Sequence, residues 1–152
     1  MSDPIVFETA TTRFALPLLF SGQAQKEFFV NEAAARTDLL LHAAIEGEIA
    51  APPAAPQPGR VWLVAASPSG LFAGHAASLA GWTGNGWRFV VPRDGLRVFD
   101  RSNAAFRLYR SGWRRQIAPS APSAGTTIDV EARAAIVLLL ERLVDAGVFA
   151  AS

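Results

Sequence analysis

The side chains that most often carry out catalysis are sparse in this chain, which has two histidines and no cysteine in 152 residues. His42 and His75 lie in different segments, and neither has a serine or carboxylate at the spacing of a catalytic triad or a metal site. The segment SGLFAGHAAS around His75 contains no G-x-S-x-G elbow. We expect both histidines to be structural or surface residues, and we predict no enzymatic activity, no bound metal and no cofactor.

A group of flat aromatic side chains offers a different chemistry, because sugar rings stack on such surfaces and arginine can bond their hydroxyls or acidic groups. The tryptophans are confined to one region, between Trp62 and Trp113. The candidate sugar contacts are Trp82, Trp87, Arg88, Tyr109 and Trp113. The alternative is that these aromatic residues form the core of a thin β fold.

Residues 60–117 must position this aromatic group, and their short apolar runs alternate with turn signals such as TGNG, RDG and RSG. The runs predict strands at 61–66, 79–82, 87–92, 96–100, 106–110 and 113–117. This spacing is typical of a small antiparallel β meander folded as a half-barrel or a sandwich.

Helices are predicted on both sides of this β domain, which makes the fold class α+β. Residues 1–50 are expected to form an extended arm and then a helix that Asn31 caps and Gly47 ends. A Pro-rich linker, 51–59, follows. A second linker, 118–127, leads to an oligomerisation helix at 128–147 that Asp129 or Thr127 caps and Gly147 ends.

The composition favours burial against other proteins. Apolar residues make up 51% of the chain and charged residues only 18%, below the roughly 25% usual for soluble domains. The net charge of +1 gives no reason to expect a nucleic-acid partner. The absence of cysteine fits a reducing compartment, and the start MSDPIVFETATTRF resembles no signal peptide. No apolar stretch reaches about 18 residues, so we expect no membrane partner.

Two segments are predicted to form interfaces between subunits or with a particle. In the arm, Pro17 interrupts an apolar run and prevents a simple helix. Its interface residues are expected to be Leu16, Leu18, Leu19 and Phe20, with hydrogen bonds from Gln23, Gln25 and Lys26. The alternative is a strand packed on its own sheet. The C-terminal helix is apolar over more than one face, and its expected interface residues are Ile136, Leu139, Leu140 and Leu143.

The segment TTRFALPLLFSGQAQKEFFVNEA (11–33) resembles the opening of a domain family of unknown function found in bacteriophages, prophages and gene transfer agents. The likeness continues through PPAAPQPGRVWLV, GLFAGHAASLAGW, GWRFVVPRDG and YRSGW, and GQAQKE is its most specific part. The resemblance implies a structural component of a virion, such as a spike base or a fibre or tail adaptor that anchors a longer host-binding protein. It implies a trimer or pentamer made in the host cytoplasm, with a capsid or tail protein, a longer fibre protein and host surface polysaccharide as partners. The alternative function is a carbohydrate-binding module for that polysaccharide.

Overall fold

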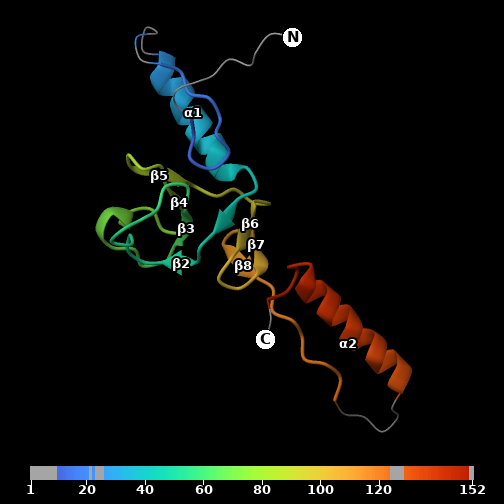
Figure 1. Cartoon of the computed structure of the whole chain (residues 1–152). Coiled ribbons are helices and arrows are strands. Elements are labelled where there is room, and N and C mark those ends of the chain that lie inside the picture. The colour runs from blue at the N-terminus through green and yellow to red at the C-terminus, as the bar shows by residue number, and fades with distance from the viewer. Residues whose placement is uncertain (1–9, 21, 23–25, 124–128, 151–152) are drawn as a thin grey trace, which may run out of the picture. The chain divides into compact units, whose positions relative to one another are not determined.

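The computed structural model describes residues 10–20, 22, 26–123 and 129–150 (Figure 1). The chain divides into two compact units, Met1–Pro92 and Arg93–Ser152. A helix lies toward each end of the chain and the strands between them are mostly antiparallel, which confirms the predicted α+β class. The boundary between the units falls inside the predicted β domain at 60–117, so its strands are shared between the two.

The first unit contains a helix and a four-stranded sheet. Its elements are α1 (Lys26–Leu40), β1 (Ala44–Ile45), β2 (Glu48–Ile49), β3 (Val61–Val64), the 3₁₀ helix η1 (Gly70–Phe72), β4 (Leu79–Trp82) and β5 (Trp87–Val90). The sheet order is β2-β3-β4-β5. Strand β2 runs parallel to β3, and the remaining pairs are antiparallel. The Pro-rich residues 51–59 therefore connect two neighbouring strands of one sheet.

Helix α1 packs on one face of this sheet. Leu39 is buried, and its side chain lies directly over Gly81 of β4, beside Val61 of β3. A Cβ at position 81 would overlap the Leu39 side chain. The missing side chain of Gly81 is thus what lets the helix approach the sheet closely.

The opposite face of the sheet carries the aromatic core of the first unit. Phe72 of η1 is fully buried and clusters with Val64 and Ala80. Trp87 and Phe89 of β5 pack against this cluster, each with its ring edge-on to Phe72 at centroid distances of 4.9 and 5.8 Å. Edge-on contacts of this kind are the favoured geometry of aromatic pairs.

The predicted limits of the first helix were wrong. Asn31 was expected to cap it, but α1 begins at Lys26 and Asn31 lies inside it. Gly47 was expected to end it, but α1 ends at Leu40, and His42 then adopts a left-handed conformation with φ 43°. Hydrogen bonds to residues far away in the sequence, described below, occupy the Asn31 side chain and the last carbonyls of the helix.

The second unit contains an antiparallel meander of β6 (Arg97–Asp100), β7 (Ala105–Tyr109) and β8 (Trp113–Arg115). Asp100 is fully buried at the end of β6. Its carboxylate accepts hydrogen bonds from Ser102 Oγ at 2.6 Å, Asn103 Nδ2 at 2.8 Å and Arg107 Nε at 2.7 Å. Burial alone would raise the pKa of Asp100, but these bonds and the Arg107 charge together hold its pKa below the ordinary value.

Helix α2 (Val130–Asp145) lies within the helix predicted at 128–147 and is two residues shorter at each end. The Asp129 side chain accepts from Ala132 N at 2.8 Å, which confirms one of the two predicted caps, whereas Thr127 lies outside the described residues. After the helix, Gly147 has φ 69°, and the amides of Gly147 and Val148 donate to Val144 O and Leu143 O. This pattern is a Schellman motif, in which glycine is the preferred residue.

Candidate functional site

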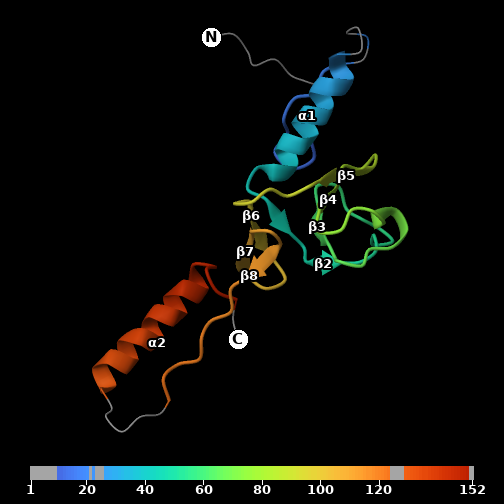
Figure 2. The same ribbon diagram turned by 180° about the vertical axis from the view of Figure 1, so that it is seen from behind.

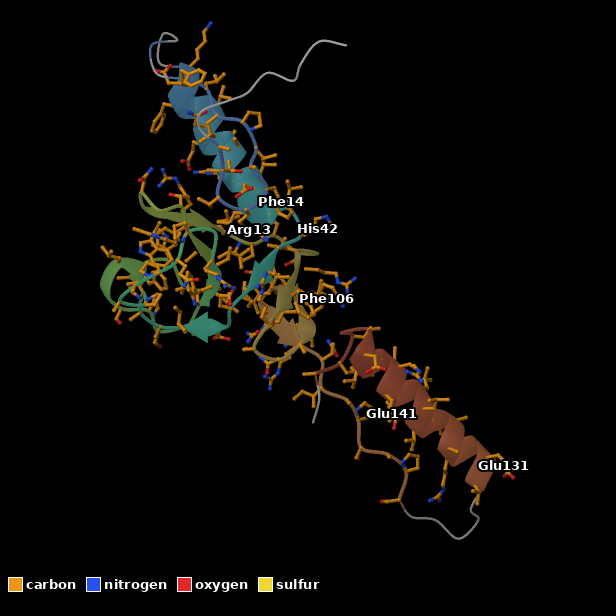
Figure 3. The ribbon with its side chains drawn as sticks, viewed as in Figure 1. Arg13, Phe14, His42, Phe106, Glu131 and Glu141 are labelled. Carbon is orange, nitrogen blue, oxygen red and sulfur yellow. The ribbon has the colours of Figure 1, made fainter. Side chains whose placement is uncertain are left out.

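The arm and helix α1 are joined by hydrogen bonds at the C-terminal end of the helix. The Arg13 guanidinium donates to the carbonyl oxygens of Asp38 at 2.7 Å, Leu39 at 2.8 Å, Leu41 at 3.1 Å and His42 at 3.1 Å. Figure 3 shows Arg13 and Phe14 beside His42 at this end of α1. A cation that bonds the last carbonyls of a helix satisfies acceptors that have no partner inside the helix and complements the helix dipole.

The carboxylate of Asp38 completes the same junction from the helix side. It is almost fully buried and accepts from Thr11 Oγ1 at 2.7 Å, Arg13 N at 3.0 Å and Phe14 N at 2.7 Å. The Thr11 hydroxyl in turn accepts from Leu16 N at 3.0 Å. These bonds fix the turn at 12–14, where the arm reverses direction.

The Asn31 side chain holds the next part of the arm. Its Oδ1 accepts from Leu19 N at 2.8 Å, and its Nδ2 donates to Leu19 O at 3.0 Å. An antiparallel bridge between Ala10 and Pro17 closes the arm into a hairpin. Residues 10–20 run alongside α1 in both views (Figure 1, Figure 2). The arm is therefore a hairpin packed on the helix of its own unit. It is neither the predicted extended segment nor the alternative, a strand of the sheet.

The predicted interface residues of the arm differ in exposure. Leu16, Leu18 and Leu19 are partly buried, whereas Phe20 is exposed at 43%. Lys26 is exposed at the start of α1, and Gln23 and Gln25 lie outside the described residues. The interface assigned to this set stays a prediction.

A groove of about 460 Å³ lies between the arm, α1 and the β4–β5 turn. Arg88 of β5 forms an ion pair across it, with Nε 2.8 Å from Glu32 Oε2, and Glu32 Oε1 accepts from Arg36 Nε at 2.9 Å. Asp38 and Asn31 also line the groove, but they already bind the arm. Most polar side chains in the groove thus hold structure together and are not available to a ligand.

The N-terminal end of α1 exposes large apolar side chains. Phe28 is exposed at 68%, Phe29 at 74% and Val30 at 46%, and the two phenyl rings meet edge-on at 5.6 Å. We call Phe28, Phe29 and Val30 the α1 aromatic patch. Adjacent exposed phenylalanines are costly in water and typical of a contact surface.

The candidate sugar contacts fall into separate groups. In the first unit, the Trp87 ring lies 5.2 Å from that of Trp82 and 5.6 Å from that of Trp62, and all three are partly buried. Arg88 is directed to the other face of the sheet, where it pairs with Glu32. Tyr109 and Trp113 pair edge-on at 5.3 Å in the second unit. The structure therefore places the rings of Trp82 and Trp62 beside that of Trp87, whereas the Arg88 side chain lies on the opposite face of the sheet.

Each of the two histidines lies near a phenylalanine ring. The His75 ring stacks on Phe89 at 3.7 Å with nearly parallel planes, and His42 lies 6.0 Å from the Phe14 ring. Among the described residues, no group of three His, Cys, Asp or Glu side chains could hold a metal ion. Within the same residues, no helix is long and apolar enough to cross a membrane.

Helix α2 has no buried residue. Large side chains remain exposed along it, including Ile136 at 42%, Leu138 at 50% and Leu139 at 58%, whereas Leu140 and Leu143 are partly buried. A helix in a globular protein normally buries an apolar stripe, so α2 presents apolar surface that the described part of the chain leaves exposed.

Sequence reasoning missed the two residues that organise the arm, Arg13 and Asp38. Each directly precedes an apolar run, which was the available signal, because charged residues are rarely buried without a specific partner. Their pairing across 25 residues could not be inferred from local spacing.

Comparison with known proteins gives one family. Residues 30–114 match the model of DUF2793, described as a protein of unknown function. No curated protein and no solved structure matches the chain. The match extends from α1 to β8 and covers more than half of the chain, which therefore belongs to the DUF2793 family.

Proposed function

We propose that the chain is a structural component of a phage-like particle, a bacteriophage or a gene transfer agent. In this proposal it acts as a spike base or as a fibre or tail adaptor that anchors a longer host-binding protein. It is made in the host cytoplasm, is assembled into the virion, and performs no catalysis. The observation that carries the proposal is the α1 aromatic patch, because exposures of 68% and 74% at Phe28 and Phe29 favour burial against another protein.

Two further features support an adaptor. The second unit carries its own exposed apolar surface on α2, so each unit offers a surface for contact with another protein. The segment 11–33 that resembles phage-associated domains includes the hairpin arm and the first part of α1. Its Thr11, Arg13 and Asn31 side chains hold the arm on the helix that presents the patch.

The test is incorporation into particles of a Phe28→Ser/Phe29→Ser variant. We expect particles from cells that carry this variant to lack the protein in immunoblots and to lack the corresponding spike or fibre in electron micrographs. Leu71→Ser is the matched control, because Leu71 is 71% exposed in the same unit and belongs to a different element. Normal incorporation of the double variant would refute the role of the patch.

A second candidate function is recognition of host surface polysaccharide by the cluster of Trp62, Trp82 and Trp87. The observation that favours it is that three neighbouring indole rings on one sheet face remain partly exposed. Binding to a glycan array or to purified capsule by the wild-type chain, lost in Trp82→Ala, would support it. An absence of binding to host polysaccharide would rule it out.

A further inference from the structure

Asn85 and Gly86 form the only Asn-Gly pair in the chain, within the segment TGNG that connects β4 to β5. An asparagine side chain lies within reach of the main-chain nitrogen of the next residue, and a bond between the two closes a cyclic imide. Glycine in the following position has no Cβ to hinder this approach. The pair is therefore a candidate for spontaneous loss of the Asn85 side-chain amide.

The β4–β5 turn leaves both reacting groups accessible. Asn85 is exposed, and Gly84 before it has φ 87°, so a residue without a Cβ flanks it on each side. The bonds that close the turn run from the amide and the hydroxyl of Thr83 to the carbonyl oxygen of Gly86, at 3.1 and 2.9 Å. In the part of the chain that the structure describes, neither the Gly86 nitrogen nor the Asn85 side chain makes a hydrogen bond.

The other two asparagines of the chain, Asn31 and Asn103, lack these conditions. The Asn31 side chain exchanges two hydrogen bonds with the main chain of Leu19. Asn103 donates from Nδ2 to the Asp100 carboxylate at 2.8 Å and accepts at Oδ1 from Arg115 at 2.6 Å. Each of the two is also followed by a residue that has a side chain. The same chain thus supplies two held asparagines for comparison.

We propose that Asn85 is a site of spontaneous deamidation in the folded protein. The Gly86 nitrogen loses its proton and bonds to Cγ of Asn85, and the side-chain amino group takes up a proton and leaves as ammonia. Water then opens the cyclic imide. Cleavage of the bond between the nitrogen and Cγ gives aspartate, and cleavage of the bond to the main-chain carbonyl carbon gives isoaspartate. Neither step is an oxidation or a reduction, and water is the sole co-reactant.

The reaction changes the charge of the chain and the main chain of the β4–β5 turn. The new carboxylate lowers the formal net charge by one unit, from +1 to 0, and isoaspartate adds a methylene group to the main chain. Asn85 lines the groove in which Arg88 pairs with Glu32, so the new charge enters the same groove as this ion pair. Because the reaction needs no enzyme, the age of the chain determines how much of it carries the charge. This inference goes beyond the proposed function and does not depend on it.

The experiment incubates the purified full chain in mildly alkaline buffer and follows each asparagine by tryptic peptide mapping. Cleavage after lysine and arginine places the three asparagines on different peptides, 27–36, 61–88 and 102–107. Peptide 61–88 should gain the mass difference between a hydroxyl and an amino group and should separate into aspartate and isoaspartate forms. Its rate should exceed that of the other two peptides by about tenfold or more. The rate should also rise with pH, because the Gly86 nitrogen must lose its proton. A chain digested without incubation corrects for reaction during the digest.

Two variants test the cyclic intermediate. Gly86→Ala should slow the loss of ammonia by about tenfold or more, because a Cβ hinders the approach of the nitrogen to Asn85. The fold accommodates this substitution, since the new Cβ would meet only the end of the Arg88 side chain, at 3.4 Å. Asn85→Gln is the matched control: it keeps an amide in the turn but adds a methylene group, which disfavours closure of the ring, and its peptide should stay unchanged.

Three results would overturn the inference. The first is an unchanged peptide 61–88 in the folded chain while the same chain unfolded in urea loses ammonia, because the turn would then protect the pair. The second is an equal rate for all three asparagines in the folded chain. The third is a wild-type rate in Gly86→Ala.

Discussion

Arg13 and Asp38 bind each other reciprocally: the Arg13 side chain donates to the Asp38 carbonyl at 2.7 Å, and the Asp38 side chain accepts from the Arg13 amide at 3.0 Å. Each side chain therefore satisfies the main chain of the other. The pair closes the end of α1 and fixes the turn of the arm at the same time. The arm and helix of the first unit thus form one folded element that presents the α1 aromatic patch.

Removal of the Asp38 carboxylate should destabilise the first unit. Asp38→Ala leaves the Thr11 hydroxyl and the amides of Arg13 and Phe14 without their acceptor, and at about 1 kcal/mol for each lost bond the free energy of unfolding should fall by about 3 kcal/mol. Thr37 is the exposed neighbour of Asp38 on α1, and Thr37→Ala should change the free energy of unfolding by less than about 0.5 kcal/mol. Urea unfolding measures both. Equal, small losses would mean that the junction contributes little.

The contact between Gly81 and Leu39 should respond to added volume. Gly81→Ala should lower the free energy of unfolding by about 1–3 kcal/mol, because the new methyl group overlaps the buried Leu39 side chain. In the background of Leu39→Ala, the same substitution should cost much less. Gly86→Ala is the control, since its Cβ would meet only the end of the Arg88 side chain, at 3.4 Å. Additive losses in the double variant would contradict the packing of α1 on β4.

Asp100 should make the second unit sensitive to acid. Its pKa in the folded state is lowered below the ordinary value, so its stabilising effect is complete above about pH 3.9 and is lost as the pH falls through the lowered folded pKa. Asp100→Asn should remove this pH dependence and cost about 2–4 kcal/mol at neutral pH, because the largely buried Arg107 side chain loses its countercharge. Urea unfolding between about pH 2 and pH 7 tests this. An unchanged pH profile in the variant would contradict it.

Trp87 and Trp82 should differ in their contribution to stability. Trp87 contacts Phe72 in the core and two other indole rings, so Trp87→Ala should cost about 3 kcal/mol or more. Trp82 contacts the ring of Trp87, and Trp82→Ala should lower the free energy of unfolding by roughly half as much. Thermal unfolding compares the two variants. A larger loss of stability in Trp82→Ala than in Trp87→Ala would contradict the central place of Trp87 in the core of this face. Trp82→Ala is therefore the better variant for a sugar-binding assay.

Local patterns predicted most of the strands and one helix correctly. The runs at 61–66, 79–82 and 113–117 contain β3, β4 and β8, because alternation and turn residues act over a few positions. Asp129 and Gly147 delimited α2 for the same reason, since capping is local.

The first helix was misjudged because its ends depend on distant residues. Asn31 has the composition of an N-cap, but its amide binds Leu19, 12 residues earlier. The last carbonyls of α1 are bound by Arg13, and no nearby glycine is needed to end the helix. The hairpin arm was likewise missed, because the apolar run around Pro17 predicted an extended segment and the contacts with Asp38 cannot be seen in sequence spacing.

The copy number of the chain in purified particles shows whether it is a structural component of a phage-like particle. Quantitative mass spectrometry of gradient-purified particles should find the chain at a constant ratio to the major capsid protein across preparations. Particles from a strain without the gene should lack both the chain and one visible appendage. Its absence from purified particles, with all of the protein in the soluble lysate, would refute the proposed role.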